Sequence, residues 1–436
     1  MTGAPISGSF SDDCFRQEER LLLHDEAIRL ILDRVPPIAA SERIPIDQAV
    51  GRVMAETVVA QRNVPLTATS AVDGWAFAHA DCLRLGGRLP ISGRVLAGKA
   101  AHGPLTLGTA VRIFTGAAVP DGADTVAMQE DCRQDGEAIL VPAGLKPGAN
   151  RRDAGEDVAA GAIVIAPGTV LRPQELAAIG SLGMAKIAVT RRLRVALLST
   201  GDEIVRPGQP IHPGEVYDAN HVMLSNLLAP MDAVVHDLGI LPDDAALVHA
   251  ALEEAARHHD LILTSGGSSR GDGDHIAEAL ATLGHRHLWH LAIKPGKPLC
   301  FGQIGPCLFL GLPGNPVAAL VNFLLYGQPL LARLSGHAWR APTRFPVPAG
   351  FSIGTRKTGR REFLRGILTT DADGHLSAQK FSRDGSGLIT GLRAADGLIE
   401  IPETVHSVTA GEPIAFIPFT EFGLPPRRTA LPDDLM

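Results

Sequence analysis

Three loops rich in glycine and proline carry the residue types that phosphate chemistry needs. They read TSGGSSRGDGDHI, IKPGKPLCFG and FLGLPGNP, and all lie between residues 264 and 316. Free backbone N–H groups in such loops can bind an anion, and lysines beside them add positive charge. The residues concerned are Gly266, Gly267, Gly314, Lys294 and Lys297. The stretch is therefore predicted to bind a phosphate or a similar anion.

Two carboxylates occur within the first of these loops. Asp272 and Asp274 offer the hard oxygen ligands that Mg²⁺ prefers. We predict Asp274 as the preferred ligand and Asp272 as the second. The same stretch could then hold a phosphate together with its metal ion.

The elements around these loops are predicted to bring them together. Each loop follows a short apolar run, at residues 261–263, 291–293 and 308–310. From 191 to 337, strand-like runs alternate with helical ones, ending in a helix from 317 to about 334. This alternation is typical of a doubly wound, parallel α/β domain. Open parallel sheets bind ligands at the carboxyl ends of their strands, and we expect the three loops there.

The other regions are predicted to form smaller modules. Short strands and glycine turns indicate β domains at 64–145 and 338–423. Residues 19–63 and 146–190 are expected to form one discontinuous linking domain, which begins with a helix at about 19–35. No convincing long helix is expected within 64–131. Residues 424–436 are predicted to be a mobile tail. The fold class is thus multidomain α/β plus β.

Composition excludes several classes of function. The chain of 436 residues has a net charge of −7 and 4% aromatic residues, which disfavours nucleic-acid binding. Its five cysteines never form CxxC, which argues against a disulfide framework or a zinc knuckle. We find no signal peptide, and no apolar run is expected to approach the roughly 18 residues of a membrane span. A soluble, cytoplasmic protein without membrane contact is predicted.

An ordered series of motifs resembles a known family. The motifs are VGRVMAETVVAQRNVPLTATSAVDGWAF, TGAAVPDGADTVAMQED, GEDV, LLSTGDEI, VYDAN, TSGGSSRGDGD, IKPGKPLCFG and LPGNPVAAL. In this order they resemble the molybdopterin molybdenumtransferases, the molybdenum insertases related to the C-terminal part of gephyrin. The resemblance extends from about residue 19 to residue 419.

The resemblance implies a fold, a reaction and partners. It implies an elongated, L-shaped subunit in a homodimer, with a molybdopterin-binding α/β domain, two small β domains and a linking domain. The implied reaction inserts molybdate into adenylylated molybdopterin with Mg²⁺ and releases AMP. The active site is expected between the α/β domain of one subunit and the N-terminal β elements of the other. The molybdopterin adenylyltransferase and target molybdoenzymes are further partners that the resemblance implies.

The resemblance and the loop chemistry together give a set of expected site residues. Those expected to be catalytic are Asp73, Glu203, Asp157, Asp243 and Lys294. Those expected to bind cofactor or oxyanion are Thr115, Gly116, Asp218, Gly266, Gly267, Ser269, Lys297, Pro313, Gly314, Asn315, Pro316, Arg365 and Ser386. The expected metal ligands are Asp274, Asp272 and Asp202.

Simpler structural roles stay open for several of these residues. Asp73 could be an Asx-turn residue, and Thr115 could merely tie a turn. Asp243 could be only a helix N-cap. Lys294 could be an ordinary surface lysine, and Arg365 a solvated arginine.

Three departures from the family pattern leave alternative functions open. Ser268 and Arg270 flank Ser269 where hydrophobic residues are usual, and His290 replaces a common lysine. These changes are the support for a paralogue that inserts tungstate or serves one molybdoenzyme. A cofactor carrier or scaffold is a further alternative, as is a molybdopterin adenylyltransferase. A dinucleotide-dependent dehydrogenase is disfavoured, because no GxGxxG follows a first strand.

Overall fold

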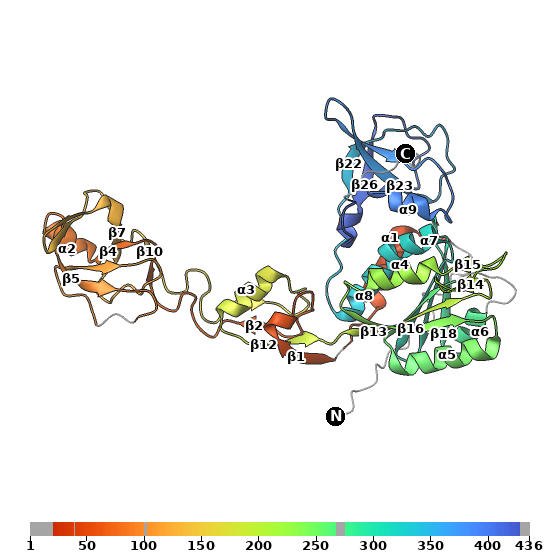
Figure 1. Cartoon of the computed structure of the whole chain (residues 1–436), viewed down its shortest axis with the longest axis horizontal. Helices are drawn as coiled ribbons and strands as arrows, with labels where there is room; N and C mark the ends of the chain where they lie inside the picture. Colours follow the sequence, from red (N-terminus) through yellow and green to blue (C-terminus); the bar gives the residue numbers. More distant parts are fainter. Residues whose placement is uncertain (1–20, 39, 100–102, 267–274, 428–436) are drawn as a thin grey trace. The chain divides into compact units, whose positions relative to one another are not determined.

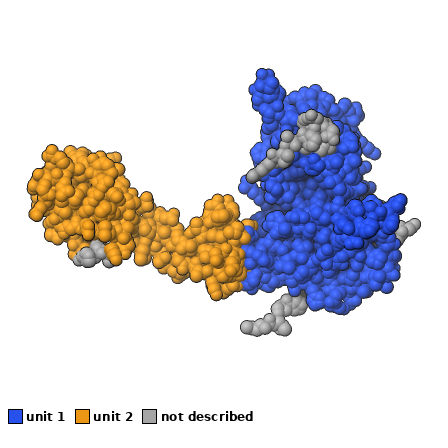
Figure 2. Space-filling model, viewed as in Figure 1, with its two compact units in different colours: residues 1–42, 51–53, 190–436 blue, residues 43–50, 54–189 orange. Residues whose placement is uncertain are grey.

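The computed structural model describes residues 21–38, 40–99, 103–266 and 275–427 (Figure 1). These residues form two compact units (Figure 2). Unit 1 contains the described residues of 1–42, 51–53 and 190–436, and unit 2 contains those of 43–50 and 54–189. Both units are therefore built from stretches that are discontinuous in sequence.

A six-stranded sheet forms the centre of the α/β part of unit 1. Its order is β16 (Ala233–Leu241), β13 (Leu193–Thr200), β17 (Leu261–Ser265), β21 (Cys307–Leu312), β20 (Pro298–Ile304) and β18 (His285–His290). The first four strands are parallel, as the alternation of strands and helices predicts. The last two run antiparallel to their neighbours and form an edge that the sequence pattern did not predict.

Helices cover both faces of this sheet (Figure 1). On one face lie α5 (Ala245–His258) and α6 (His275–Leu283), packed against Ile262 and Phe309. On the other lie α1 (His24–Arg34), α4 (Ala219–Leu228) and a helical segment made of α7 (Pro316–Asn322), the π-helical turn η4 (Phe323–Gly327) and α8 (Gln328–Ser335). The helix predicted at 317–334 is confirmed, with an unpredicted π turn at its centre.

This buried helical segment corrects one prediction. Residues Pro316–Ser335 form 20 helical residues with a mean hydropathy of 1.4, long and apolar enough to cross a membrane. The prediction that no segment approaches a membrane span missed this helix, because it considered uninterrupted apolar runs and Asn322, Gln328 and Arg333 interrupt this one. The segment is 89% buried within the structure, as a core helix of a folded domain is.

The apolar run at 291–293 does not form the strand that was predicted for it. Ile293 and Lys294 form the short strand β19, which pairs with β23 (Arg361–Thr370) of the C-terminal sheet. The KPGKP loop nevertheless lies at the carboxyl edge of the α/β sheet, because β20 runs antiparallel and begins there at Pro298. The prediction of the loop's position thus holds for a different reason.

The C-terminal part of unit 1 is a second sheet with a shared core. Its order is β19, β23, β25 (Gly397–Ile401), β26 (Pro413–Pro418) and β22 (Phe345–Pro348), with β24 (Leu376–Lys380) on β23. Phe363, Leu398 and Ile417 belong to the same hydrophobic cluster as the α/β core. The helix α9 (Ile389–Ala394) and the turn η5 (Phe419–Phe422) complete this part, and Arg427 pairs with Asp396 at 3.0 Å.

Unit 2 holds a third six-stranded sheet and a smaller helical region. The sheet order is β7 (Thr125–Met128), β4 (Gly74–Phe77), β6 (Ala110–Ile113), β5 (Arg88–Val95), β9 (Ala138–Leu140) and β8 (Arg133–Asp135), with the short helix α2 (His79–Arg84). The smaller region packs α3 (Pro173–Ser181) on the pair β2 (Val58–Val59) and β11 (Ile163–Ile165). A two-residue pair, β3 (Thr69–Ser70) with β10 (Arg151–Arg152), lies beside the sheet's loops.

Candidate functional site

A pocket of about 550 Å³ opens at the carboxyl edge of the α/β sheet, and we call it the edge pocket. Its walls come from the ends of β13 and β17, from the residues after β21 and from the start of α4. Six expected site residues line it: Glu203, Asp218, Gly266, Gly314, Asn315 and Pro316. Loops distant in sequence therefore meet here, as the parallel sheet predicts.

Asn220 joins three walls of the edge pocket. Its Nδ2 donates to the Ser265 Oγ at 2.7 Å and to the Gly314 carbonyl oxygen at 2.6 Å. Because a carbonyl oxygen can only accept, the Gly314 contact fixes the orientation of the amide. The side chain is buried, and its Oδ1 has no partner within the described structure. Our sequence reasoning missed Asn220, although it ends the VYDAN motif.

Asp218 has a structural role at the same place. Its carboxylate accepts from the backbone N–H of His221 at 3.0 Å and so caps α4. The other oxygen lies 3.2 Å from Nη1 of Arg206. The charge of this buried carboxylate is thus neutralised, and Asp218 is better placed to position the pocket wall than to do chemistry.

The loop after β13 holds Glu203 against the backbone. A Cβ added at Gly201 would overlap the Glu203 carboxylate, and Gly201 has a φ of +129°. Glycine is therefore required both for the turn and for the space that Glu203 occupies. Glu203 is exposed at the pocket, and no ion pair to it occurs among the described residues.

Asp202 and Asp243 meet each other rather than the edge pocket. The Asp202 Oδ1 accepts from the backbone N–H of Asp243 at 3.1 Å. The N-cap of α5 is Asp244, which accepts from Ala246 and Leu247 at 2.9 Å, so the N-cap alternative for Asp243 was wrong. Both Asp202 and Asp243 are exposed, and neither is among the residues that line the described pocket.

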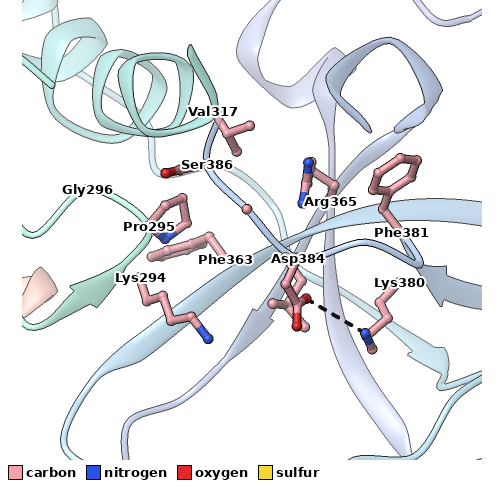
Figure 3. Close-up of a pocket in the computed structure, with 12 residues that line it drawn as sticks. Lys294, Pro295, Gly296, Val317, Phe363, Arg365, Lys380, Phe381, Asp384 and Ser386 are labelled. Carbon is pink, nitrogen blue, oxygen red and sulfur yellow. Dashed lines mark ion pairs between the residues drawn. The ribbon is translucent and has the colours of Figure 1, made fainter. Parts of the chain in front are cut away.

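A second pocket, of about 330 Å³, lies between the KPGKP loop and the C-terminal sheet, and we call it the Arg365 pocket. The expected residues Lys294, Arg365 and Ser386 line it, together with Lys380, Phe381 and Asp384 (Figure 3). The Lys294 ammonium lies 3.5 Å from Glu362 and its side chain is 58% exposed. Lys380 lies 3.9 Å from Asp384.

Arg365 is a buried cation without a carboxylate partner in the part of the chain that the structure describes. It is 8% exposed, and its guanidinium donates to the carbonyls of Leu388 at 3.2 Å and Arg383 at 2.7 Å. The guanidinium also lies 4.8 Å from the Phe381 ring centroid. Burial lowers the pKa of this group. A buried, unneutralised positive charge favours an anion, and the solvated-arginine alternative was wrong.

The two pockets adjoin through consecutive residues. Pro316 lines the edge pocket and Val317 the Arg365 pocket, and the same holds for Gly387 and Ser386. The Ser386 carbonyl accepts from the backbone N–H of Val317 at 2.9 Å, which fixes the C-terminal loop at the start of α7. The two pockets therefore share a wall made by the start of α7 and this loop.

The buried side-chain amide of Asn322 holds the KPGKP loop in place. Nδ2 of Asn322, which is 0% exposed, donates to the carbonyls of Ala318 at 2.9 Å and Gly296 at 3.3 Å. A Cβ at Gly296 would overlap this Nδ2, so only glycine fits there. Lys297 is exposed and is not among the lining residues of the described pockets, so its binding role stays a prediction, as does that of the buried Pro313.

The expected residues of unit 2 include one preorganised carboxylate. Thr115 donates to Asp73 Oδ1 twice, from its backbone N–H and from its hydroxyl, both at 2.7 Å. These two bonds hold the pKa of the Asp73 carboxyl below its usual value. Gly116 has a φ of +78°, and its N–H donates to the Ser70 carbonyl. Asp157 is exposed, and its backbone N–H donates to the Val64 carbonyl at 3.1 Å.

Several expected residues lie outside the described residues. They are Gly267, Ser268, Ser269, Arg270, Asp272 and Asp274. The metal prediction therefore stays a prediction. Within the described chain, the one group of three close metal-ligand side chains is Asp371, Asp373 and His375, exposed between β23 and β24 and away from both pockets.

Family models and relatives match nearly the whole chain. The matching models are described as the MoeA N-terminal region (domain I and II) at residues 22–183, a probable molybdopterin binding domain at 196–333, and the MoeA C-terminal region (domain IV) at 351–419. A molybdopterin molybdenumtransferase of Haemophilus influenzae is 36% identical over 401 residues, which cover 92% of this chain and 99% of the relative. This chain belongs to the molybdopterin molybdenumtransferase family.

Other members of the molybdopterin molybdenumtransferase family support the same assignment. The molybdopterin molybdenumtransferase 2 of Mycobacterium tuberculosis is 34% identical over 84% of this chain and 92% of its own length. A solved molybdopterin biosynthesis MoeA protein of Pyrococcus horikoshii OT3 superposes with a TM-score of 0.78, at 29% identity, over 92% of this chain and 100% of that one. The family resemblance expected from the ordered motifs is confirmed.

Proposed function

We propose that this molybdopterin molybdenumtransferase inserts molybdenum from molybdate into adenylylated molybdopterin and releases AMP. The observation that carries the proposal is the buried Arg365 guanidinium, which has no described carboxylate partner. Molybdate is a tetrahedral dianion. Arg365, Lys294 and Lys380 line one pocket and offer a fixed planar donor and two point charges to such an ion.

The edge pocket suits the nucleotide end of the substrate. Gly314 brings a backbone N–H group to its wall, where no side chain limits the approach of a phosphate. The N–H of Gly266, expected to be free, already donates to the Leu312 carbonyl at 3.0 Å, so Gly266 contributes open space to the wall and no donor. Because the edge pocket and the Arg365 pocket adjoin, a phosphoanhydride in the first lies beside an oxyanion in the second. This proximity supports coupling between AMP release and metal insertion.

We assign separate roles to the two carboxylates that line the edge pocket. Asp218 is neutralised by Arg206 and orients α4, so it positions the wall. Glu203 is exposed at the pocket and is held against Gly201, so its carboxylate can accept a hydrogen bond from a water molecule that donates its other hydrogen to the attacking oxygen. Lys294 is proposed to hold the oxyanion in line with the phosphorus.

The donor set fits a Mg²⁺ ion held jointly by protein and substrate. Protein Mg²⁺ sites often use one or two carboxylates together with substrate phosphates, and Glu203 offers one such carboxylate at the pocket. Asp274 and Asp272 are the proposed principal ligands. Asp202 is less suited, because one of its oxygens already accepts from Asp243. When bound, the ion would offset the charge of the phosphates.

We further propose that the active site is completed by a second copy of the chain. Asp73 in unit 2 is exposed and is held in the ionised state by Thr115, which suits a carboxylate presented to a partner. In a homodimer, Asp73 of one subunit would then face the edge pocket of the other. The molybdopterin adenylyltransferase and target molybdoenzymes are the proposed further partners, in the cytoplasm.

The test is an insertion assay with purified protein, adenylylated molybdopterin, Mg²⁺ and either molybdate or tungstate. AMP release and activation of an apo-molybdoenzyme are both followed. We expect Glu203→Gln and Asp73→Asn to abolish AMP release, and the exposed control Asp371→Asn to retain it. Tight substrate binding without AMP release by the wild-type protein would favour the carrier alternative.

Mixed dimers test the shared active site. Asp73→Asn and Glu203→Gln subunits carrying different affinity tags are co-expressed, and the doubly tagged dimer is purified. If the site is shared, one of its two sites has both native carboxylates and activity returns. If each site lies within one subunit, the mixed dimer stays as inactive as its parents.

A further inference from the structure

A third pocket, of about 470 Å³, adjoins the Arg365 pocket on the C-terminal sheet, and we call it the Arg360 pocket. The two pockets share four lining residues: Lys294, Leu364, Lys380 and Asp384. The walls that belong to the Arg360 pocket but not to the Arg365 pocket include Arg356, Lys357, Arg360 and Glu362. The edge pocket, the Arg365 pocket and the Arg360 pocket therefore follow one another in a row.

The Arg360 pocket combines cationic donors without a carboxylate partner and a largely buried carboxylate acceptor. Lys357 and Arg360 have no carboxylate within 4.0 Å among the residues described in unit 1. The Glu362 side chain is only 13% exposed. Its Oε1 lies 3.4 Å from Arg356 Nε, and its Oε2 lies 3.5 Å from Lys294 Nζ. Both distances exceed those of strong charge-assisted bonds, so each oxygen can still accept from a ligand.

Arg356 fixes the backbone that forms one wall of this pocket. Its guanidinium is buried and donates to the backbone carbonyls of Pro402 at 2.8 Å, of Arg360 at 2.5 Å and of Val405. These bonds tie the segment that carries Lys357 and Arg360 to the end of β25. The cations of the pocket are therefore presented from a fixed backbone.

We propose that the Arg360 pocket binds the pterin end of the molybdopterin substrate, an inference that rests on the proposed function. In that substrate the nucleotide lies at one end, the metal-binding dithiolene in the middle and the pterin ring at the other end. The three pockets have a matching order, with the oxyanion-binding Arg365 pocket between the other two.

The side chains of the pocket match the edges of a pterin. The 2-amino group and the adjacent ring N–H form a pair of donors, which a carboxylate such as Glu362 can accept. The ring carbonyl and ring nitrogens accept from ammonium or guanidinium groups, which Lys357 and Arg360 supply. A planar guanidinium can also stack on the ring. A simple oxyanion would use the cations and be repelled by Glu362.

The opposite expected effects of Glu362 on a pterin and on an oxyanion give a test. Full-length protein is titrated with 6-hydroxymethylpterin, followed by its fluorescence, and separately with inorganic phosphate. Glu362→Gln keeps the size of the side chain and removes its charge. If the pocket binds a pterin, this variant binds the pterin about tenfold more weakly, because it loses one hydrogen bond to a charged group. If the pocket binds a simple oxyanion, the variant leaves pterin affinity unchanged, and this outcome overturns the proposal whether or not phosphate, which can also enter the adjoining Arg365 pocket, binds more tightly.

Arg360→Ala and Arg393→Ala supply the second variant and its control. Arg393 is an exposed cation on α9 that lines none of the three pockets described here. We expect Arg360→Ala to weaken pterin binding and to raise the KM for adenylylated molybdopterin about tenfold, with kcat retained. Arg393→Ala should change neither. AMP affinity, which reports the edge pocket, should be equal in all three variants.

The outcomes separate this inference from the proposed function. If the wild-type protein binds the pterin through Arg360 and Glu362 but releases no AMP, the insertase proposal fails and the pterin site stands. Two results would overturn the pterin site while insertion is normal. In the first, the wild-type protein shows no pterin binding at millimolar probe. In the second, both variants keep the wild-type pterin affinity and the wild-type KM. Thermal unfolding of each variant verifies that it is folded.

Discussion

Thr115 donates two hydrogen bonds to a single oxygen of Asp73, one from its backbone and one from its hydroxyl, each 2.7 Å long. A carboxylate that accepts two bonds at one oxygen is both oriented and kept ionised. Asp73 is therefore not simply an Asx-turn residue. It is a charged group set in place by the neighbouring loop, and its second oxygen is left to other contacts.

Replacing Thr115 by valine should raise the pKa of the Asp73 carboxyl towards its ordinary value. The variant loses the hydroxyl donor and keeps the backbone one, so the rise is partial. A depressed carboxyl pKa adds stability that is complete above the ordinary pKa and is lost as pH falls through the folded pKa. The change should thus be confined to acid pH. Carbon-13 NMR titration of Asp73 checks this, with Asp73→Asn for assignment. An unchanged titration would contradict the role given to the hydroxyl.

Replacing Gly201 by alanine should lower kcat through Glu203. The new Cβ would overlap the Glu203 carboxylate and displace it from the edge pocket. Gly208 is a matched control, because its φ of +94° also disfavours alanine but no atom lies within 4 Å of the added Cβ. Both variants should lose about 1–2 kcal/mol of stability from backbone strain. Only Gly201→Ala should lose about 100-fold in the rate of AMP release. Equal rates would exclude this role for Glu203.

Replacing Arg365 by methionine should weaken molybdate binding about 10- to 100-fold. This range corresponds to the loss of about 1.5–3 kcal/mol, the contribution of one hydrogen bond to a charged group. Methionine keeps the apolar stem of the side chain and lacks the guanidinium and its charge. Arg383→Ala is the control, because Arg383 lies 5.8 Å from the same Phe381 ring and does not line the Arg365 pocket. Isothermal titration with molybdate measures both. Similar losses in the two variants would point to non-specific electrostatics.

Replacing Asn220 by alanine should raise the dissociation constant of AMP about tenfold, because three walls of the edge pocket lose their common hydrogen bonds. The control is Asn226→Ala on the same helix α4. Asn226 is exposed and donates only within the helix, to the Val222 carbonyl at 2.7 Å. AMP binding by Asn226→Ala should equal that of the wild type. If Asn220→Ala also binds AMP normally, the bridging bonds do not position the ligand.

Replacing the buried His24 by phenylalanine should reduce the loss of stability in acid. Burial lowers the pKa of His24 from 6.5 to about 4, and its Nδ1 lies 2.9 Å from the Tyr326 hydroxyl. Between these two pH values the unfolded chain binds a proton that the native chain does not, so stability falls as pH falls. The contribution is about 3 kcal/mol over this range, at 1.36 kcal/mol per pKa unit.

Urea unfolding of wild type and His24→Phe at about pH 7 and pH 4.5 measures the difference. The phenyl ring keeps the ring contacts of His24 with Tyr326 and Phe363. The exposed His375→Asn serves as a control and should follow the wild type. A stability gap between wild type and His24→Phe that is the same at both pH values would contradict the assignment.

The sequence by itself determined the family, the parallel α/β core and the edge of the sheet at which the expected loops meet. These features depend on local information: alternating strand and helix patterns, glycine and proline at the loops, and ordered motifs. Glu203, Gly266 and Gly314 could be placed together because the carboxyl ends of parallel strands share one edge of a sheet. Their convergence followed from topology without any side-chain detail.

Only the tertiary structure decided which of the expected residues have free charges and which are occupied. In sequence, neither Asp218 nor Arg365 shows whether its charge will meet a charged partner. In the fold, Asp218 meets Arg206, whereas Arg365 meets backbone carbonyls and an aromatic ring. Asn220 likewise became a bridging residue only when three distant loops met around it. Burial and partners depend on contacts between residues far apart in the chain, and the local pattern of the sequence does not specify them.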